Sequence, residues 1–184
     1  MSVRTICWQT PNEILKRTAR LRVDDGDTIQ SATWEATPAG LTITPGVISQ
    51  TDASALISGG TAGITYTLTI HAIGTSGQRY DQSISLKVAQ RQLTEFFPMD
   101  PSDILDFKAT LELDPTDTDT VASATWTVSP AGPVVVSTSF TSTTATARID
   151  ANSSAVGRYI ATVLMVGTSG QRYEQSILIK ISQQ

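Results

Sequence analysis

Residues 64–88 read ITYTLTIHAIGTSGQRYDQSISLKV, and this stretch decides the fold. From residue 64 to residue 72 apolar side chains alternate with polar ones, and the same period of two returns from residue 80 to residue 88. Between these runs, Gly74-Thr75-Ser76-Gly77 supplies two glycines that can adopt positive φ, as a tight turn requires. The stretch therefore predicts a β-hairpin with one buried face, and Tyr66 falls on that face.

The same pattern occurs twice in the chain. The heptapeptide at Gly74–Tyr80, GTSGQRY, returns at Gly167–Tyr173, and the tetrapeptide at Ser31–Trp34, SATW, returns at Ser123–Trp126. Each motif recurs just over 90 positions further on, so the chain of 184 residues holds two copies of one unit. We place the first domain at 1–90, ending near Val88, and the second at 91–184; each begins with its own leader segment.

Further short runs of β-branched and apolar residues precede the hairpin in the first copy. They cover residues 19–23, 29–36, 41–44 and 53–58. With the hairpin they give six or seven strands in a unit of about 90 residues, with turn signals at roughly 8–12-residue intervals. The sequence thus predicts an all-β protein made of two tandem immunoglobulin-like β-sandwich domains.

Aromatic residues mark the expected cores. The segment Gly157–Ala161, GRYIA, resembles the corner of immunoglobulin domains at which a tyrosine precedes a core position by two residues. This places Tyr159 in the second core, as Tyr66 is in the first. Trp34 and Trp126 are expected to be the core indoles opposite these corners; the alternative is an exposed position at which they stack on a ligand.

Composition excludes several classes of function. The formal net charge is −4 and the pI is about 4.9, with no basic stripe, which argues against nucleic acid as a partner. With His71 and Cys7 the only residues of their kinds, one chain cannot assemble a His/Cys zinc site or an internal disulfide. The amino terminus lacks a signal-peptide apolar run, and no stretch is apolar enough for a membrane span. We expect a soluble product of a reducing cytoplasm.

The remaining chemistry-bearing residues favour structural roles. The acidic turn Asp24-Asp25-Gly26-Asp27 and its counterpart at Asp114, Asp117 and Asp119 could offer oxygen ligands to calcium, but Asp and Gly are ordinary turn residues and the spacing is not that of a calcium loop. His71 falls on the polar face of its strand, where we expect an unpaired, solvated imidazole. The glycine-rich segment 58–63 is interpreted as a turn. The sequence therefore predicts no catalytic residue, no cofactor and no metal site.

Two apolar leaders are neither turns nor alternating strands by their pattern. Residues 6–11 read ICWQTP ahead of the first domain, and residues 96–101 read FFPMDP ahead of the second. Their aromatic residues are Trp8, Phe96 and Phe97. These side chains either cover the end of their own sandwich or dock against a partner chain.

A resemblance to a known family follows from these blocks taken together. They are the aromatic-proline leader with DPSDILD at 100–106, GDTIQSATW at 26–34, PAGLT at 38–42, SGGTAG at 58–63 and TSGQRYDQSI at 75–84. In this combination the chain resembles the fibre–tail adaptor proteins of tailed bacteriophages, and the resemblance covers both halves. The second copy departs from the pattern at 150–157, which lacks the double glycine, and at Pro133, which replaces Leu41.

The resemblance implies a virion structural protein without catalysis, made in the host cytoplasm and joining a tail or neck component to a fibre. Its partners would be other virion proteins, not nucleic acid or membrane, and it would be present in several copies in a symmetric assembly. The alternative is a bacterial surface or carbohydrate-binding module of tandem immunoglobulin-like domains, because one fold hosts many functions.

Overall fold

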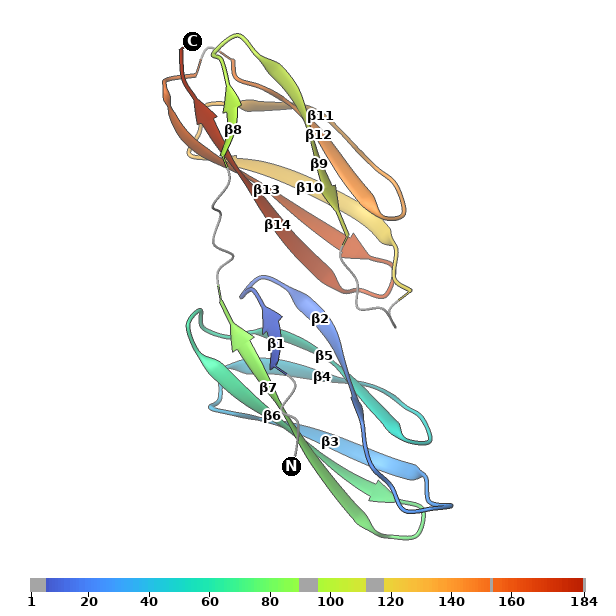
Figure 1. Ribbon diagram of the computed structural model, residues 1–184. Helices are drawn as coiled ribbons and strands as arrows, with labels where there is room; N and C mark the ends of the chain where they lie inside the picture. Colours follow the sequence, from blue (N-terminus) through green and yellow to red (C-terminus); the bar gives the residue numbers. More distant parts are fainter. Residues whose placement is uncertain (1–5, 90–95, 112–117, 153, 184) are drawn as a thin grey trace. The chain divides into compact units, whose positions relative to one another are not determined.

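The computed structural model describes residues 6–89, 96–111, 118–152 and 154–183. The chain divides into two compact units, residues 1–90 and residues 91–184. Each unit is built from seven described strands arranged in two sheets (Figure 1). The chain is thus an all-β protein of two immunoglobulin-like β-sandwich domains, which confirms the predicted fold class.

The first unit pairs a four-stranded sheet with a three-stranded one. In spatial order, the four strands are β1 (Ile6–Gln9), β7 (Arg79–Val88), β6 (Thr65–Gly74) and β3 (Ile29–Thr37). The three are β2 (Ile14–Arg20), β5 (Asp52–Gly59) and β4 (Leu41–Ile48). Strand β1 runs parallel to β7, and all other neighbours are antiparallel.

The second unit repeats this topology strand for strand. Its four-stranded sheet has the order β8 (Phe96–Met99), β14 (Arg172–Ile181), β13 (Gly157–Gly167) and β10 (Val121–Ser129), with β8 parallel to β14. Its three-stranded sheet has the order β9 (Ile104–Thr110), β12 (Thr144–Asp150) and β11 (Val134–Phe140). The hairpins β6–β7 and β13–β14 are the ones that the repeated GTSGQRY motif closes.

The core of the first unit lies between the inward faces of its two sheets. Strand β6 alternates strictly, with Tyr66, Leu68 and Ile70 buried and the threonines between them turned outward. Trp34 is partly buried and packs against both apolar clusters of this unit. The hydroxyl of Tyr66 accepts a hydrogen bond of 2.9 Å from the Thr61 N–H.

The second unit has an equivalent core. Trp126 and Tyr159 are buried, and Ala161 is fully buried at the place of the immunoglobulin core cysteine. The Tyr159 hydroxyl donates a hydrogen bond of 2.9 Å to the Ala155 carbonyl, four residues upstream, as in a tyrosine corner. The hydroxyls of Tyr66 and Tyr159 are therefore each satisfied by a backbone group close to their own strand.

Several predicted element boundaries differ from those of the structure. The leaders are strands, because the last strand of each unit offers a free edge that a short parallel segment can pair with. The segment predicted at 19–23 is instead strand β2, which ends at Arg20, and the run predicted at 41–44 continues to Ile48 through a bulge. Ile64 precedes β6 and is exposed, so it is not part of the buried face.

Candidate functional site

A single carboxylate holds the hairpin turn of the first unit. Asp27 Oδ1 accepts hydrogen bonds from the Thr75 hydroxyl (2.8 Å) and the Ser76 N–H (3.1 Å), and its Oδ2 accepts from the Ser76 and Tyr80 hydroxyls, both at 2.7 Å. The acceptor lies at the end of the loop before β3, and the donors lie in the turn between β6 and β7 and at the start of β7. We call this arrangement the aspartate clasp.

Asp119 makes the same clasp in the second unit. It accepts hydrogen bonds from the Thr168 hydroxyl (2.8 Å), from the Ser169 N–H (2.9 Å) and hydroxyl (2.7 Å), and from the Tyr173 hydroxyl (3.3 Å). A glycine begins each turn, and a Cβ atom at Gly74 or Gly167 would overlap the carboxylate. The repeated GTSGQRY motif is therefore the donor half of a structural clasp, and its first glycine makes room for the acceptor.

The pKa values of both carboxyls follow from this environment. The Ser76 hydroxyl, followed by those of Tyr80 and Thr75, lowers the pKa of Asp27 far below its ordinary range. Burial opposes ionisation of Asp119, but the hydrogen bonds from Ser169 and Thr168 prevail together and also lower its pKa. Burial and the bond to Asp27 raise the pKa of Tyr80.

Protein groups engage the acidic turn of the first unit. Both oxygens of Asp27 are engaged by protein donors, and Asp24 accepts the Asp27 N–H through its carbonyl, closing the turn. Over the described ranges, no cluster of three or more His, Cys, Asp and Glu side chains could hold a metal ion. Of the counterpart acidic turn, Asp114 and Asp117 lie outside the described residues.

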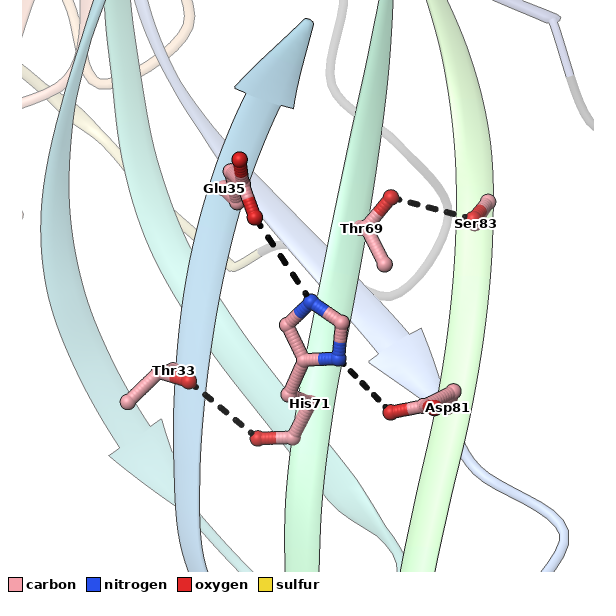
Figure 2. Close-up of polar contacts among 6 residues, drawn as sticks. All are labelled: Thr33, Glu35, Thr69, His71, Asp81 and Ser83. Atoms are coloured by element: carbon pink, nitrogen blue, oxygen red, sulfur yellow. Dashed lines mark hydrogen bonds and ion pairs between the residues drawn. The ribbon is translucent and has the colours of Figure 1, made fainter.

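The outward face of the four-stranded sheet differs between the two units. In the first unit it is polar and paired: His71 Nδ1 lies 2.7 Å from Asp81 Oδ1, and His71 Nε2 lies 3.8 Å from Glu35 Oε2 (Figure 2). The Thr69 and Ser83 hydroxyls lie 3.2 Å apart on the same face. His71 is exposed, as its strand pattern predicts, but the prediction that it is unpaired is wrong, because acidic residues flank it on both neighbouring strands.

In the second unit the same face carries apolar side chains at three positions that are polar in the first. Leu164 stands where the first unit has His71, and Ile160 and Leu178 stand where it has Thr67 and Ser85. Ile160 and Leu178 are register partners in β13 and β14, and Phe96 of β8 pairs with Leu178 from the other side. Sequence reasoning overlooked Ile160 and Leu178, although aligning the two copies position by position shows both substitutions.

The predicted docking residues are placed differently from one another. The ring of Phe97 meets that of the buried Phe107 edge-on, with centroids 5.8 Å apart. Phe96 points outward, and the guanidinium of Arg158 lies over its ring at 5.0 Å. Phe96 is 41% exposed and Phe97 is 47% exposed. The backbone of Trp8 belongs to β1 and pairs with Lys87, whereas its side chain, like that of Cys7, lies outside the described residues.

The loops before β6 and β13 also separate the two copies. In the first, a Cβ atom at Gly60 would press on Val88 and Leu41, and its φ of 92° is in the left-handed region. In the second, Asn152 takes the positive φ, with a value of 50°. The positive φ that each loop requires is thus provided by glycine in the first unit and by asparagine in the second.

Within the described residues, the structure contains no helix of the length and hydrophobicity that a membrane crossing requires.

Comparison with solved structures gives low similarity over nearly the whole chain. The titin immunoglobulin tandem domains A164-A165 share 10% identity at a TM-score of 0.35, covering 97% of this chain and 93% of that one. The Bacteroides ovatus mixed-linkage glucan utilization locus protein SGBP-B shares 16% identity at a TM-score of 0.29, covering 97% of this chain and 43% of that one. No curated protein matches the chain.

A family model matches both halves of the chain. Its description is "Podophage GP4 fiber-tail adaptor protein gp77", and the matched residues are 10–87 and 99–180. The two matched ranges contain the clasp residues, the buried aromatic residues and both hairpins, and the boundary between them coincides with the connection between the two units.

Proposed function

Because the chain belongs to the podophage fibre–tail adaptor family, we propose that it joins a tail or neck component of the virion to a fibre. The observation that carries this proposal is the match of the family model to each half of the chain. The protein is then a structural component, without catalytic chemistry, made in the host cytoplasm and incorporated into the particle in several copies around a symmetric ring. Its partners are other virion proteins, not nucleic acid or membrane.

An adaptor must hold two different neighbours, and two nearly identical domains can do so only where they differ. Their shared features, the clasp and the hairpin, are used to build each domain. The differences are found in the leaders, in the loops before β6 and β13, and on the outward sheet faces. Within the leaders, Trp8, Phe96 and Phe97 are the proposed contacts, since aromatic side chains bury much area at a small entropic cost.

Composition analysis of purified particles tests the proposed function. Particles banded on a density gradient and washed in high salt should retain the chain at a fixed stoichiometry to the tail proteins. A cytoplasmic host protein of similar abundance serves as the control for carry-over. If the chain is present only at the level of that control, it is not a virion component and the adaptor function is wrong.

The alternative of an exported carbohydrate-binding module gains no specific support. Such modules bind sugars on rows of exposed aromatic rings. Among the described residues the exposed aromatic rings are those of Phe96, Phe97 and Phe140. Phe97 packs on Phe107 and Phe96 lies beneath Arg158, so these two rings do not form an open stacking platform.

A further inference from the structure

Three apolar side chains stand side by side on the outward face of the second unit. Phe96, Leu178 and Ile160 occupy register-paired positions on β8, β14 and β13. We call them the apolar row. Ile160 is 39% exposed and Phe96 is 41% exposed. Their strand neighbours Ile179 and Ala161 are fully buried, and Phe97 packs on the buried Phe107, so the row lies on the opposite face from the sandwich interior.

The first unit shows that folding does not need this row. At the equivalent positions of β7 and β6 it carries Ser85 and Thr67, which are register partners in the same topology. Further along β13, Leu164 replaces His71, but the hydrogen-bonded pair Thr162 and Ser176 separates it from the row, and Val166 corresponds to the apolar Ile73 of the first unit. Adjacent exposed apolar side chains on only one of two equivalent sheets are typical of a protein-binding site.

Two cations adjoin the apolar row on one side. Arg158 and Lys180 are register partners in the next row of the same face, and the Arg158 guanidinium is held over the Phe96 ring. In the described part of the chain neither has a carboxylate partner; the nearest acidic position on this face of β14 is Glu174, three rows away. Two adjacent cations beside an apolar row complement a segment that presents apolar side chains next to carboxylates.

We propose that this face docks a neighbouring virion protein through a segment that places apolar side chains on Phe96, Leu178 and Ile160 and carboxylates on Arg158 and Lys180. The proposal rests on the adaptor function and names the surface that performs one half of it. It assigns one partner to the second unit. The polar, paired face around His71 and Asp81 on the first unit does not compete for that partner.

A double substitution that copies the first unit provides the test. Ile160→Thr with Leu178→Ser gives the second unit the residues that the same sheet positions carry in the first unit. Val134→Thr with Val136→Thr removes two exposed apolar side chains from the other sheet of the same unit and is the matched control. Phage made with each variant is purified, and the copy number of the chain per particle is measured together with the melting temperature of the isolated protein.

The proposal predicts at least about a tenfold loss of copy number for Ile160→Thr/Leu178→Ser, with an unchanged melting temperature and a normal copy number for the control. A normal copy number for the first variant would overturn the docking surface while leaving the adaptor function intact. Absence of the unmodified chain from particles would instead overturn the adaptor function and the docking surface with it.

The charge part of the proposal has a separate test. Arg158→Glu with Lys180→Glu alters two exposed side chains and should also lower the copy number, more strongly at low salt, because it opposes the proposed carboxylates. If this variant is incorporated at the same copy number as the wild type, the partner does not present carboxylates to Arg158 and Lys180. Sedimentation of the isolated wild-type chain tests whether this face instead binds a second copy. If the wild type is a dimer and the Ile160→Thr/Leu178→Ser variant is a monomer, the face is a dimer interface and the proposal is wrong.

Discussion

The carboxylate of Asp119 organises a turn that lies some 50 positions away in sequence. It accepts from the Thr168 and Ser169 side chains, from the Ser169 backbone and from Tyr173, and it also accepts the N–H of its own neighbour Thr120. Hydrogen bonds to an ionised acceptor are stronger than neutral ones. The buried clasp in the second unit therefore ties the loop before β10 to the β13–β14 hairpin.

Asp119→Asn should destabilise the second unit by about 2 kcal/mol, because an amide cannot accept at both ends and turns an NH₂ group toward hydroxyl donors. Chemical denaturation monitored by tryptophan fluorescence measures the change. Asp25→Asn, an exposed change in the acidic turn of the first unit, is the control and should have no effect beyond about 0.5 kcal/mol. Equal stability of Asp119→Asn and wild type would contradict the clasp.

The clasps also predict how stability depends on pH. Their folded pKa values are lowered, so their contribution is complete above the ordinary aspartate pKa of about 4 and is lost progressively as the pH falls below it toward the folded pKa. Wild type should therefore lose stability between about pH 5 and pH 2 more steeply than Asp27→Asn/Asp119→Asn. Parallel melting profiles of the two proteins over this range would contradict the assignment.

The glycine before each turn gives a third prediction at this scale. Gly74→Ala places a Cβ atom against the Asp27 carboxylate and should cost about 1–3 kcal/mol through overpacking. In an Asp27→Ala background the obstacle is gone, so the cost of Gly74→Ala should fall to well under half. A double-mutant cycle measures this coupling, and additive effects would show that Gly74 is present for another reason.

The sequence carries a signal for the clasp that a motif-by-motif interpretation misses. Asp27-Thr28 and Asp119-Thr120 recur with the same offset as the SATW block, so this aspartate belongs to the repeat. Asp25 and Asp117 share that offset, so the offset alone does not single out the clasp residue. The pairing of His71 with Asp81 follows from the register of the predicted hairpin, but the sequence interpretation did not work out that register. The contact with Glu35 was not predictable in the same way, because long-range packing, which local alternation does not encode, places β3 beside β6.

At the scale of the element, the leaders are where sequence pattern and structure differ most. A four-residue segment such as β8, with sequence FFPM, is too short to show a period of two, and it pairs in parallel with a strand more than 70 residues away. The hairpins were predictable because both their strands and their turn lie within one continuous stretch. The leaders were not, because only the finished sheet edge makes them strands.

The two phenylalanines of β8 should respond differently to truncation. Phe97→Ala removes a ring that packs on Phe107 and should cost about 1–2 kcal/mol, whereas Phe96→Ala removes an outward ring and its contact with Arg158 and should cost below about 1 kcal/mol. Denaturant unfolding of the second unit compares them. The proposed docking role reverses the order for particle incorporation, which Phe96→Ala should impair more. If Phe96→Ala and Phe97→Ala had equal effects on stability and equal effects on particle incorporation, the assignment of Phe97 to folding and of Phe96 to docking would be wrong.

At the scale of the whole molecule, the duplication itself was fully visible in the sequence. Each copy carries its own tryptophan, tyrosine corner and clasp, and the chain divides into compact units at residues 90 and 91. What the duplication could not reveal is the outward face on which the copies diverge, because exposure depends on the register of four strands.

Each unit should therefore fold on its own. Residues 1–90 and residues 91–184, expressed separately, should each give a single cooperative thermal transition, since each has a complete core. Broad, non-cooperative melting of either fragment would show that its core is completed by the rest of the chain.

The central claim is that this chain couples a fibre to the tail. The most direct test is the protein composition of particles assembled without it, produced by a stop codon early in its reading frame and complemented in trans as the control. The proposed function predicts particles that keep their capsid and tail proteins but lose the fibre protein, with the fibre restored on complementation. Particles that lack this chain yet carry a normal number of fibres would contradict it.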